Sequence, residues 1–351
     1  MMVSSLSAAL LLGAAAAIPG SSAHAAPDAA SGWCATPGAA AVGKAAALPL
    51  AAAGGSAADD WAPLPSTEHQ HVTAAALVVA GKVMVAGGST LKGEGQNSTE
   101  FLMASASSSG SGTSHQQTWL PGFPMLVPRS AHGAALVKGV AHLFGGIDHR
   151  SHANPKPATA TAESLQSDGW RAAPSLPTPR TSVRAASLAD GRALLVGGFL
   201  GGSANFSYLN STLFFDGSRY TPGPQLPCPQ KPPGHAPDCA LSNIAVQECG
   251  GSVFAIGGSG EGPAYAAVWR LDVKGGAKAW VAAPPLPAAT TWAGSACVQQ
   301  QSVAAGGNHQ TTQQQQQQQQ GGGFTLFSIG GFNGEFRPTP TVYTLQVRVP
   351  L

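Results

Sequence analysis

Two stretches decide the fold: Val140-Ala141-His142-Leu143-Phe144-Gly145-Gly146, and Trp170-Arg171-Ala172-Ala173-Pro174-Ser175-Leu176-Pro177 after it. The first is a short apolar run that ends in a glycine pair, and the second is an aromatic residue with Leu-Pro close behind. Both landmarks recur along the chain. The glycine pairs are Gly87-Gly88, Gly145-Gly146, Gly197-Gly198, Gly257-Gly258 and Gly330-Gly331, and the aromatic residues are Trp61, Trp119, Trp170, Tyr220 and Trp280. Successive aromatic residues are 58, 51, 50 and 60 residues apart, so the chain repeats a unit of about 50 residues.

The composition indicates an all-β protein. Of 351 residues, 45 are Gly and 28 are Pro, the two residues that favour helices least, and β-branched and aromatic residues gather in short runs between turn residues. Charged residues make up 10% of the chain and the net charge is +2. Because no block of Lys or Arg could neutralise phosphates, we expect no nucleic-acid partner.

A strand that ends in Gly-Gly, followed by a loop, a strand and then Trp with Leu-Pro, resembles the kelch repeat. The resemblance covers Asp59 to Leu351. It implies a β-propeller, in which each repeat forms a four-stranded blade that buries its faces against its neighbours. In such a fold the aromatic residue fills the space between adjacent blades, and the glycines lie where neighbouring backbones crowd.

The repeat predicts five four-stranded blades, closed by an N-terminal strand. The last repeat ends after its third strand, Val342 to Val349, and Trp61 precedes the first inner strand, so the strand at Trp61 is expected to complete the last blade. A sixth, degenerate blade around Trp33 and Gly54-Gly55 is the alternative. The expected organisation is a signal peptide over 1–25, an Ala-rich linker over 26–58, and the propeller over 59–351.

The N-terminus predicts export. An apolar stretch from Leu6 to Ile18 precedes Ala23-His24-Ala25, which is typical of signal-peptide cleavage, but Met1 to Ser5 carry no basic residue. The protein is therefore expected to be secreted or to enter the secretory pathway, with an organelle lumen as the alternative. No later stretch is long enough for a membrane span, and we expect a monomer.

Further features agree with export. Acceptor triplets for N-glycosylation begin at Asn97, Asn205 and Asn210. Five cysteines leave at least one unpaired within the chain, and a disulfide between Cys228 and Cys239 would close an insertion in the fourth repeat. Residues 301–323, which include the tract Gln313 to Gln320, are predicted to form a disordered loop on the face opposite the ligand.

Candidate ligand-binding residues lie where blades present loops to one face, before the first strand and after the glycine pairs. They are Arg129, Arg180, Arg184, His149 and Arg337. For Arg129 and Arg180 an alternative stays open, since an arginine at the start of an inner strand often binds only carbonyls. His149 and His152 share a loop without fixed geometry, so we expect no metal, and no motif calls for a cofactor.

Two functions are compatible with these residues. The first is a secreted binding module for carbohydrate or protein. The second is a sugar mutarotase, because Gly257 to Gly262, Val268 to Asp272 and Trp280 with Leu286-Pro287 are similar to units of the sialic acid (N-acetylneuraminate) mutarotase, or epimerase, propellers. That resemblance implies proton exchange by Glu261, Glu335 or His132, with an arginine holding a carboxylate.

Overall fold

The computed structural model describes residues 65–109, 112–153, 156–200, 207–227, 242–260, 264–276, 278–299, 323–333, 335 and 337–347. The chain has two compact units, Met1–Ser66 and Thr67–Leu351, and nearly all described residues belong to the second unit. The predicted signal peptide, linker, sixth blade, closing strand at Trp61 and Gln tract all lie outside the described residues, as do Cys228 and Cys239. No helix of the described part is long and apolar enough to cross a membrane.

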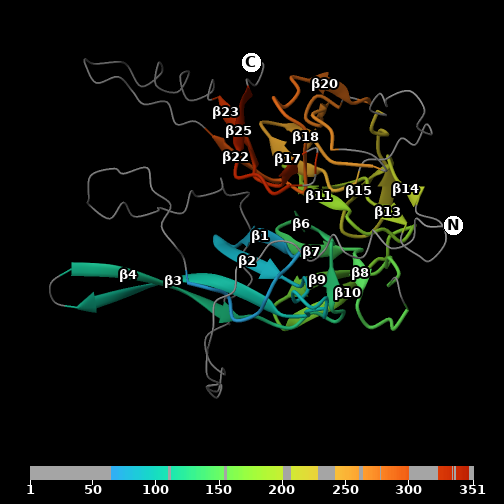
Figure 1. Ribbon diagram of the computed structural model, residues 1–351. Coiled ribbons are helices and arrows are strands. Elements are labelled where there is room, and N and C mark those ends of the chain that lie inside the picture. The colour runs from blue at the N-terminus through green and yellow to red at the C-terminus, as the bar shows by residue number, and fades with distance from the viewer. Residues whose placement is uncertain are drawn as a thin grey trace, which may run out of the picture. The chain divides into compact units, whose positions relative to one another are not determined.

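The described chain forms an all-β, five-bladed propeller, which confirms the predicted fold class (Figure 1). Blades 1 and 2 are four-stranded antiparallel sheets. Blade 1 contains β1 (Ala75–Val79), β2 (Lys82–Ala86), β3 (Thr99–Ser109) and β4 (Gly112–Pro121), and blade 2 contains β6 (Gly133–Val137), β7 (Val140–Phe144), β9 (Ala162–Gln166) and β10 (Gly169–Ala173). Blade 2 therefore follows the strand order expected from its two sequence landmarks. The β3–β4 hairpin is longer than its counterparts and projects from the blade (Figure 1).

Blades 3 and 4 repeat this arrangement. Blade 3 contains β11 (Arg184–Ser187), β12 (Ala193–Val196), β15 (Thr212–Phe215) and β16 (Tyr220–Pro222), and blade 4 contains β17 (Ala245–Cys249), β18 (Ser252–Ile256), β19 (Val268–Asp272) and β20 (Val281–Ala283). Blade 5 has three described strands, β22 (Gly294–Gln299), β23 (Phe324–Ile329) and β25 (Val342–Val347). The inner strands β1, β6, β11, β17 and β22 contact one another in that order, so the blades adjoin in chain order.

Short strand pairs link the segment before each inner strand to the segment after each glycine pair. They are β5 (Arg129–Ser130) with β8 (Ile147–Asp148), and β21 (Thr290–Thr291) with β24 (Phe332–Asn333). In blade 3 an isolated bridge between Thr181 and Phe199 makes this link, and β13 (Phe199–Leu200) also pairs with β14 (Ser207–Tyr208) of the same loop. Val72 and Ser242 form isolated bridges to Ser89 and Ser259 in the same way. These two sets of loops therefore share one face, which we call the Gly-Gly face.

The glycine pairs are needed because adjacent blades crowd the backbone there. Gly145 and Gly146 have φ values of 62° and 98°, where side chains are strained. A Cβ on Gly145 would lie 2.4 Å from the carbonyl oxygen of Arg180, and one on Gly146 would lie 2.6 Å from that of Ser130. Gly146 N–H also donates to the Arg180 carbonyl of the next blade. The glycine pair thus allows the backbones of blades 2 and 3 to come into direct contact.

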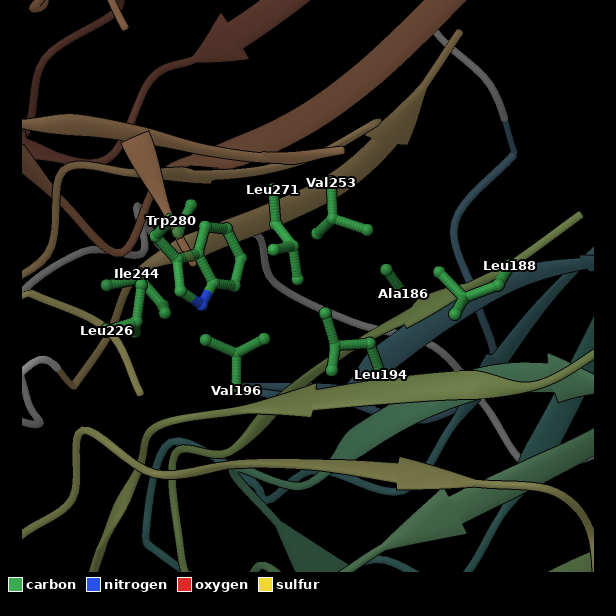
Figure 2. Close-up of a cluster of buried hydrophobic side chains, with 10 residues drawn as sticks. Ala186, Leu188, Leu194, Val196, Leu226, Ile244, Val253, Leu271 and Trp280 are labelled. Atoms are coloured by element: carbon green, nitrogen blue, oxygen red, sulfur yellow. The ribbon is translucent and has the colours of Figure 1, made fainter. Parts of the chain in front are cut away.

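Tryptophans fill the space between blades, as predicted. Trp170 packs with Met84 of blade 1 and Leu143 of blade 2, and its indole N–H donates to Phe123 O and Thr99 Oγ1. Trp280 packs between blades 3 and 4 beside Val196 and Leu226 (Figure 2). Trp119, on β4, is partly buried, and its predicted place between blades stays a prediction.

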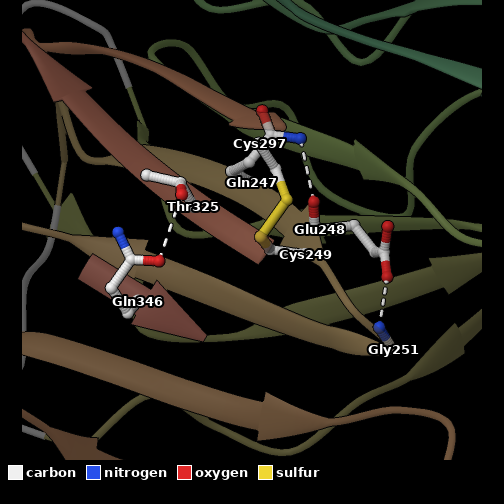
Figure 3. The surroundings of a disulfide bond; sticks show 7 residues. All are labelled: Gln247, Glu248, Cys249, Gly251, Cys297, Thr325 and Gln346. Atoms are coloured by element: carbon white, nitrogen blue, oxygen red, sulfur yellow. Dashed lines mark hydrogen bonds between the residues drawn. A yellow bond between two sulfur atoms is a disulfide. The ribbon is translucent and has the colours of Figure 1, made fainter. Parts of the chain in front are cut away.

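A disulfide joins the inner strands of blades 4 and 5. It links Cys249 on β17 to Cys297 on β22, with Cα atoms 5.6 Å apart (Figure 3). The sequence did not predict this pair. The signal was present, however, because both cysteines follow the start of an inner strand by a few residues in successive repeats, and successive inner strands are neighbours.

Candidate functional site at the Gly-Gly face

One residue in each blade adopts a left-handed conformation immediately before the inner strand. These residues are Thr73, Ala131, Ser182, Asn243 and Trp292, with φ between 51° and 58°. Left-handed geometry is unfavourable for non-glycine residues, above all for a β-branched or bulky one, and persists only where the surroundings impose it. Here the neighbouring blades impose it: the N–H groups of Ala131, Ser182 and Trp292 donate to the carbonyls of Thr73, Ala131 and Asn243.

These five residues form an arc around the propeller axis at the Gly-Gly face, because they precede the five inner strands. Ala131 and Ser182 are buried, whereas Thr73, Asn243 and Trp292 are partly exposed. The partly exposed side chains of blades 4 and 5 are an amide and an indole. The arc therefore offers a ligand both hydrogen bonds and an aromatic surface near the axis.

Hydroxyl groups surround Asn243. Its Nδ2 donates to Ser259 Oγ at 3.4 Å, and Ser259 Oγ lies 3.1 Å from Thr291 Oγ1. Thr291 in turn donates to the backbone carbonyl of Asn243. Asn243 Oδ1 is buried and accepts no hydrogen bond within the described residues. An unpaired buried acceptor is costly, and a donor from a ligand or a water molecule would relieve that cost.

Arg184 is the predicted ligand-binding residue that fits this site best. It opens β11, is partly exposed, and donates from Nε to the Ile244 carbonyl at 3.2 Å, directly after Asn243. Its two terminal nitrogens make no hydrogen bond within the described part of the chain. Burial lowers the pKa of this guanidinium, but an arginine stays charged at neutral pH. Arg184, Asn243 and Trp292 therefore form a candidate anion-binding and stacking site.

Arg129 is a structural residue. It has no exposed surface, and its guanidinium donates to Gly145 O, Thr161 O, Thr161 Oγ1 and Glu163 Oε1, the last at 2.6 Å. Burial lowers its pKa, although Glu163 opposes this change. Glu163 also accepts from the N–H groups of Leu126 and Val127. Arg129 thus holds the segment before β6 against blade 2. Its side chain cannot contact a ligand in this structure.

Arg180 occupies the equivalent position in blade 3. Its guanidinium donates to Gly197 O, Ser211 O and Ser211 Oγ, only 3% of its surface is exposed, and burial lowers its pKa to about 10. In blade 1 a histidine takes this position: His71 Nδ1 lies 2.6 Å from Gly87 O, and His71 Nε2 lies 3.0 Å from Glu100 Oε1. The structure therefore supports the alternative, in which these arginines bind carbonyls as part of the repeat.

No hydrogen bond or ion pair joins the remaining described candidates to Arg184. His149 is partly buried and hydrogen-bonds Ser130 Oγ through Nε2 at 2.8 Å, and burial lowers its pKa, with Lys156 adding to the effect. Arg337 pairs with Glu335 at 3.2 Å, and both are exposed on the blade 5 loop of the Gly-Gly face. Glu261 lies outside the described residues.

His132 is buried and poorly placed for proton exchange with a ligand. Only 1% of its surface is exposed, and neither ring nitrogen makes a good hydrogen bond within the described residues. Burial lowers its pKa well below the ordinary value, with Arg129 and Arg184 adding to this effect. His132 is therefore neutral at physiological pH and packs between blades 1 and 2, against Gly87 and Gly146.

Two of the three predicted glycosylation sites are described. Asn97 Nδ2 donates to Met125 O and Asn210 Nδ2 donates to Leu226 O, at equivalent positions of blades 1 and 3. A glycan on either nitrogen would have to leave room for these contacts. Asn205 lies outside the described residues, and no group of three His, Cys, Asp or Glu that could hold a metal occurs within the described part.

The comparisons with known proteins support the fold. No family model matches the chain, and no curated protein does. Among solved structures, one titled "Structure of YjhT" aligns with a TM-score of 0.50 at 13% identity, over 80% of this chain and 96% of that one. At this identity the similarity concerns the fold alone. It extends along nearly the full length of the other protein.

Proposed function

We propose that this protein is a secreted kelch-type binding module that recognises an acidic carbohydrate at the Gly-Gly face. The observation that carries this proposal is the grouping of Arg184, Asn243 and Trp292 on successive blades. A guanidinium with unengaged N–H groups suits a carboxylate or sulfate, an amide and hydroxyls suit sugar hydroxyls, and an indole suits the apolar face of a sugar ring.

Secretion is proposed on the N-terminal signal and on the disulfide. Structural disulfides persist in oxidising compartments, and the Cys249–Cys297 bond lies in the interior between two blades. The acceptor triplets at Asn97, Asn205 and Asn210 support the same compartment. Expression of the full chain in secreting cells, followed by N-terminal sequencing of the protein in the medium, tests it. A protein that stays inside the cells with residues 1–25 intact would contradict export.

The binding proposal is tested by glycan-array screening of the secreted protein, followed by titration of each acidic ligand against three variants. Arg184→Gln removes the charge, while Asn243→Gly and Trp292→Gly remove side chains and keep residues that tolerate positive φ. Each should weaken binding at least about tenfold. Arg171→Gln is the matched control, because Arg171 is exposed and pairs with Asp168 on the outer strand of blade 2. Unchanged binding by all three variants would overturn the site.

The resemblance to sugar mutarotases favours a second function at the same face. Mutarotation needs only a proton donor, a proton acceptor and a group that holds the sugar. Among the described candidates, Glu335 is exposed beside Arg337 and is available to a ligand. Exchange spectroscopy of the two anomers of each sugar that binds measures turnover directly. If the protein speeds anomer exchange, and Glu335→Gln stops this exchange while affinity is retained, the protein is an enzyme. If the exchange rates are the same with and without the protein, it acts as a binding module.

A further inference from the structure

A groove lies between blades 2 and 3 on the side of the hairpin turns, opposite the Gly-Gly face. Its volume is about 370 Å³, near the lower end of the range for small-molecule sites. The polar groups along it are Lys138, His142, Ser164, Gln166 and Ser218, and Val137, Val140, Ala172, Ala173 and Pro174 provide apolar walls. The groove therefore combines an apolar surface with several hydrogen-bonding groups.

The repeat shows that blade 2 departs from its neighbours at this position. In blade 1 the paired residues of the second and third strands are Met84 and Phe101, and in blade 3 they are Leu194 and Phe214. In blade 2 the same pair is His142 and Ser164. Two large apolar side chains are thus replaced by an imidazole and a hydroxyl. Blades 4 and 5 also have a polar residue on the third strand, in the pairs Phe254–Arg270 and Phe327–Thr344, so the polar residue on the second strand, His142, is what sets blade 2 apart among the described blades. A local departure from the core pattern is what a functional site produces.

The aromatic residue of the next blade is also different. Trp170 and Trp280 cover the corresponding surface of blades 1 and 3, but blade 3 presents Tyr220 to blade 2. The Tyr220 ring stacks on Phe215 with centroids 4.5 Å apart, and its hydroxyl donates to Pro174 O. A phenol is smaller than an indole, and Tyr220 is held between Phe215 of its own blade and Pro174 of blade 2, beside the groove.

His142 is fixed as a hydrogen-bond acceptor. Its Nδ1 donates to the Val140 carbonyl at 2.9 Å, and its ring stacks on Phe144 and meets the edge of Phe215. Burial lowers its pKa, so the ring is neutral at physiological pH. With the proton on Nδ1, Nε2 carries a lone pair, and it makes no hydrogen bond within the described residues. The residue lines the groove, so this acceptor suits a hydroxyl of a ligand.

Ser164 and Lys138 supply the complementary donors. Ser164 Oγ accepts from Gln166 Nε2 at 3.0 Å, which leaves the hydroxyl proton free to donate. Lys138 begins the β6–β7 turn with a φ of 50°, and its N–H donates to Gly191 O of blade 3. This contact holds the lysine at the mouth of the groove, near Gly217. Gln166 Oε1 adds a second acceptor on the same wall.

We propose that this groove is a second binding site, for a single sugar ring or a cyclic polyol. Such a ligand has an apolar face for the Val, Ala and Pro walls and a ring of hydroxyls that both donate and accept. Its hydroxyls donate to His142 Nε2 and Gln166 Oε1 and accept from Ser164 and Lys138. The ligand is either the terminal sugar of a glycan or a free polyol, which share this chemistry. The site does not depend on the ligand of the Gly-Gly face.

The experiment is an NMR titration of the full, ¹⁵N-labelled protein at millimolar probe concentrations. The probes are the methyl glycosides of glucose, galactose and mannose, which mimic a terminal sugar, and myo-inositol, which represents a free polyol. Binding is expected to shift the His142 Nε2 resonance, because the nitrogen gains a hydrogen bond, while the Nδ1–H tautomer persists. If none of the four probes moves that resonance, the proposal is wrong.

Two variants separate binding from packing. His142→Met with Ser164→Phe places the blade 1 residues in blade 2, so it should fill the groove, keep or raise the Tm and abolish binding. Ser164→Ala removes one donor without adding volume, and should weaken binding at least about tenfold at unchanged Tm. If the double variant fails to fold, Ser164→Ala alone tests whether the groove binds the probes. Equal binding by Ser164→Ala would overturn the site, whereas Glu94→Gln, an exposed position on the opposite face, should bind these probes as the native protein does.

Discussion

Trp170 tests the packing between blades at the level of one side chain. The ring is 3% exposed and contacts both blade 1 and blade 2, so Trp170→Ala should lower the free energy of unfolding by about 3–5 kcal/mol. Val281→Ala, on an outer strand and 57% exposed, should change it by less than about 0.5 kcal/mol. Urea unfolding followed by circular dichroism measures both, and equal midpoints for Trp170→Ala and the native protein would refute the packing role.

Glu100 stabilises the segment before β1, residues 68–71, and this stabilisation depends on pH. Burial would raise its pKa, but hydrogen bonds from His71, from the N–H groups of Glu68 and His69, and from the His69 ring lower it below the ordinary 4.5. A lowered folded-state pKa stabilises the fold above about pH 4.5, and this stability is lost as pH falls through the lowered value.

Glu100→Gln should therefore be less stable than the native protein at pH 7, and the difference should shrink as the pH is lowered toward 3. Urea unfolding at a series of pH values measures it. Glu94→Gln, an exposed carboxylate on the same face, is the control and should show no such trend. A stability difference that is the same at every pH would show that the charge of Glu100 does not matter.

Single residues also show where prediction from sequence stops. The role of Trp170 could be predicted, because a large aromatic residue at a fixed phase of the repeat has one suitable place. The role of Arg129 could not be decided, because an arginine after a turn suits a ligand and a carbonyl equally well. The deciding fact was Glu163, which lies 34 residues further along the chain and meets Arg129 only through the pairing of β7 with β9.

At the level of elements, the second strand of blade 2, Val140–Phe144, could be predicted from the sequence, because its apolar run ends at a glycine pair. The left-handed arc could not, since Thr73, Ala131, Ser182, Asn243 and Trp292 share no residue type. Their common conformation is imposed by hydrogen bonds between blades. The candidate site was missed for this reason, apart from Arg184.

The disulfide between β17 and β22 should stabilise these two elements together. It spans 48 residues, and the chain-entropy estimate for a loop of this length is about 4 kcal/mol. Cys249→Ser with Cys297→Ser should therefore lose up to that amount in urea unfolding, and adding reductant to this variant should cost nothing further at this site. Alkylation of Cys249 in the denatured, unreduced native protein would contradict the bond.

For the whole molecule, closure of the propeller by the strand at Trp61 stays a prediction. A groove of about 190 Å³ lies between blades 4 and 5, lined by Ile256, Leu286, Leu326 and Leu345, at positions equivalent to those around Trp170. We expect Trp61→Ala to destabilise the propeller about as much as Trp170→Ala, because each would remove an indole between blades. Unchanged stability of Trp61→Ala would contradict this closure, and Trp33→Ala is the control, since the linker reading assigns Trp33 no packing role.

Hydrogen–deuterium exchange in the presence of the tightest acidic glycan from the array tests whether the ligand binds at the Gly-Gly face. Bound glycan should slow exchange at residues 182–184, 243–244 and 290–292, which carry the arc and Arg184. Deletion of Gln313 to Gln320 should leave this pattern unchanged. Protection confined to the hairpin turns of the opposite face, at residues 138–140, 189–191 and 250–252, would contradict binding at the Gly-Gly face.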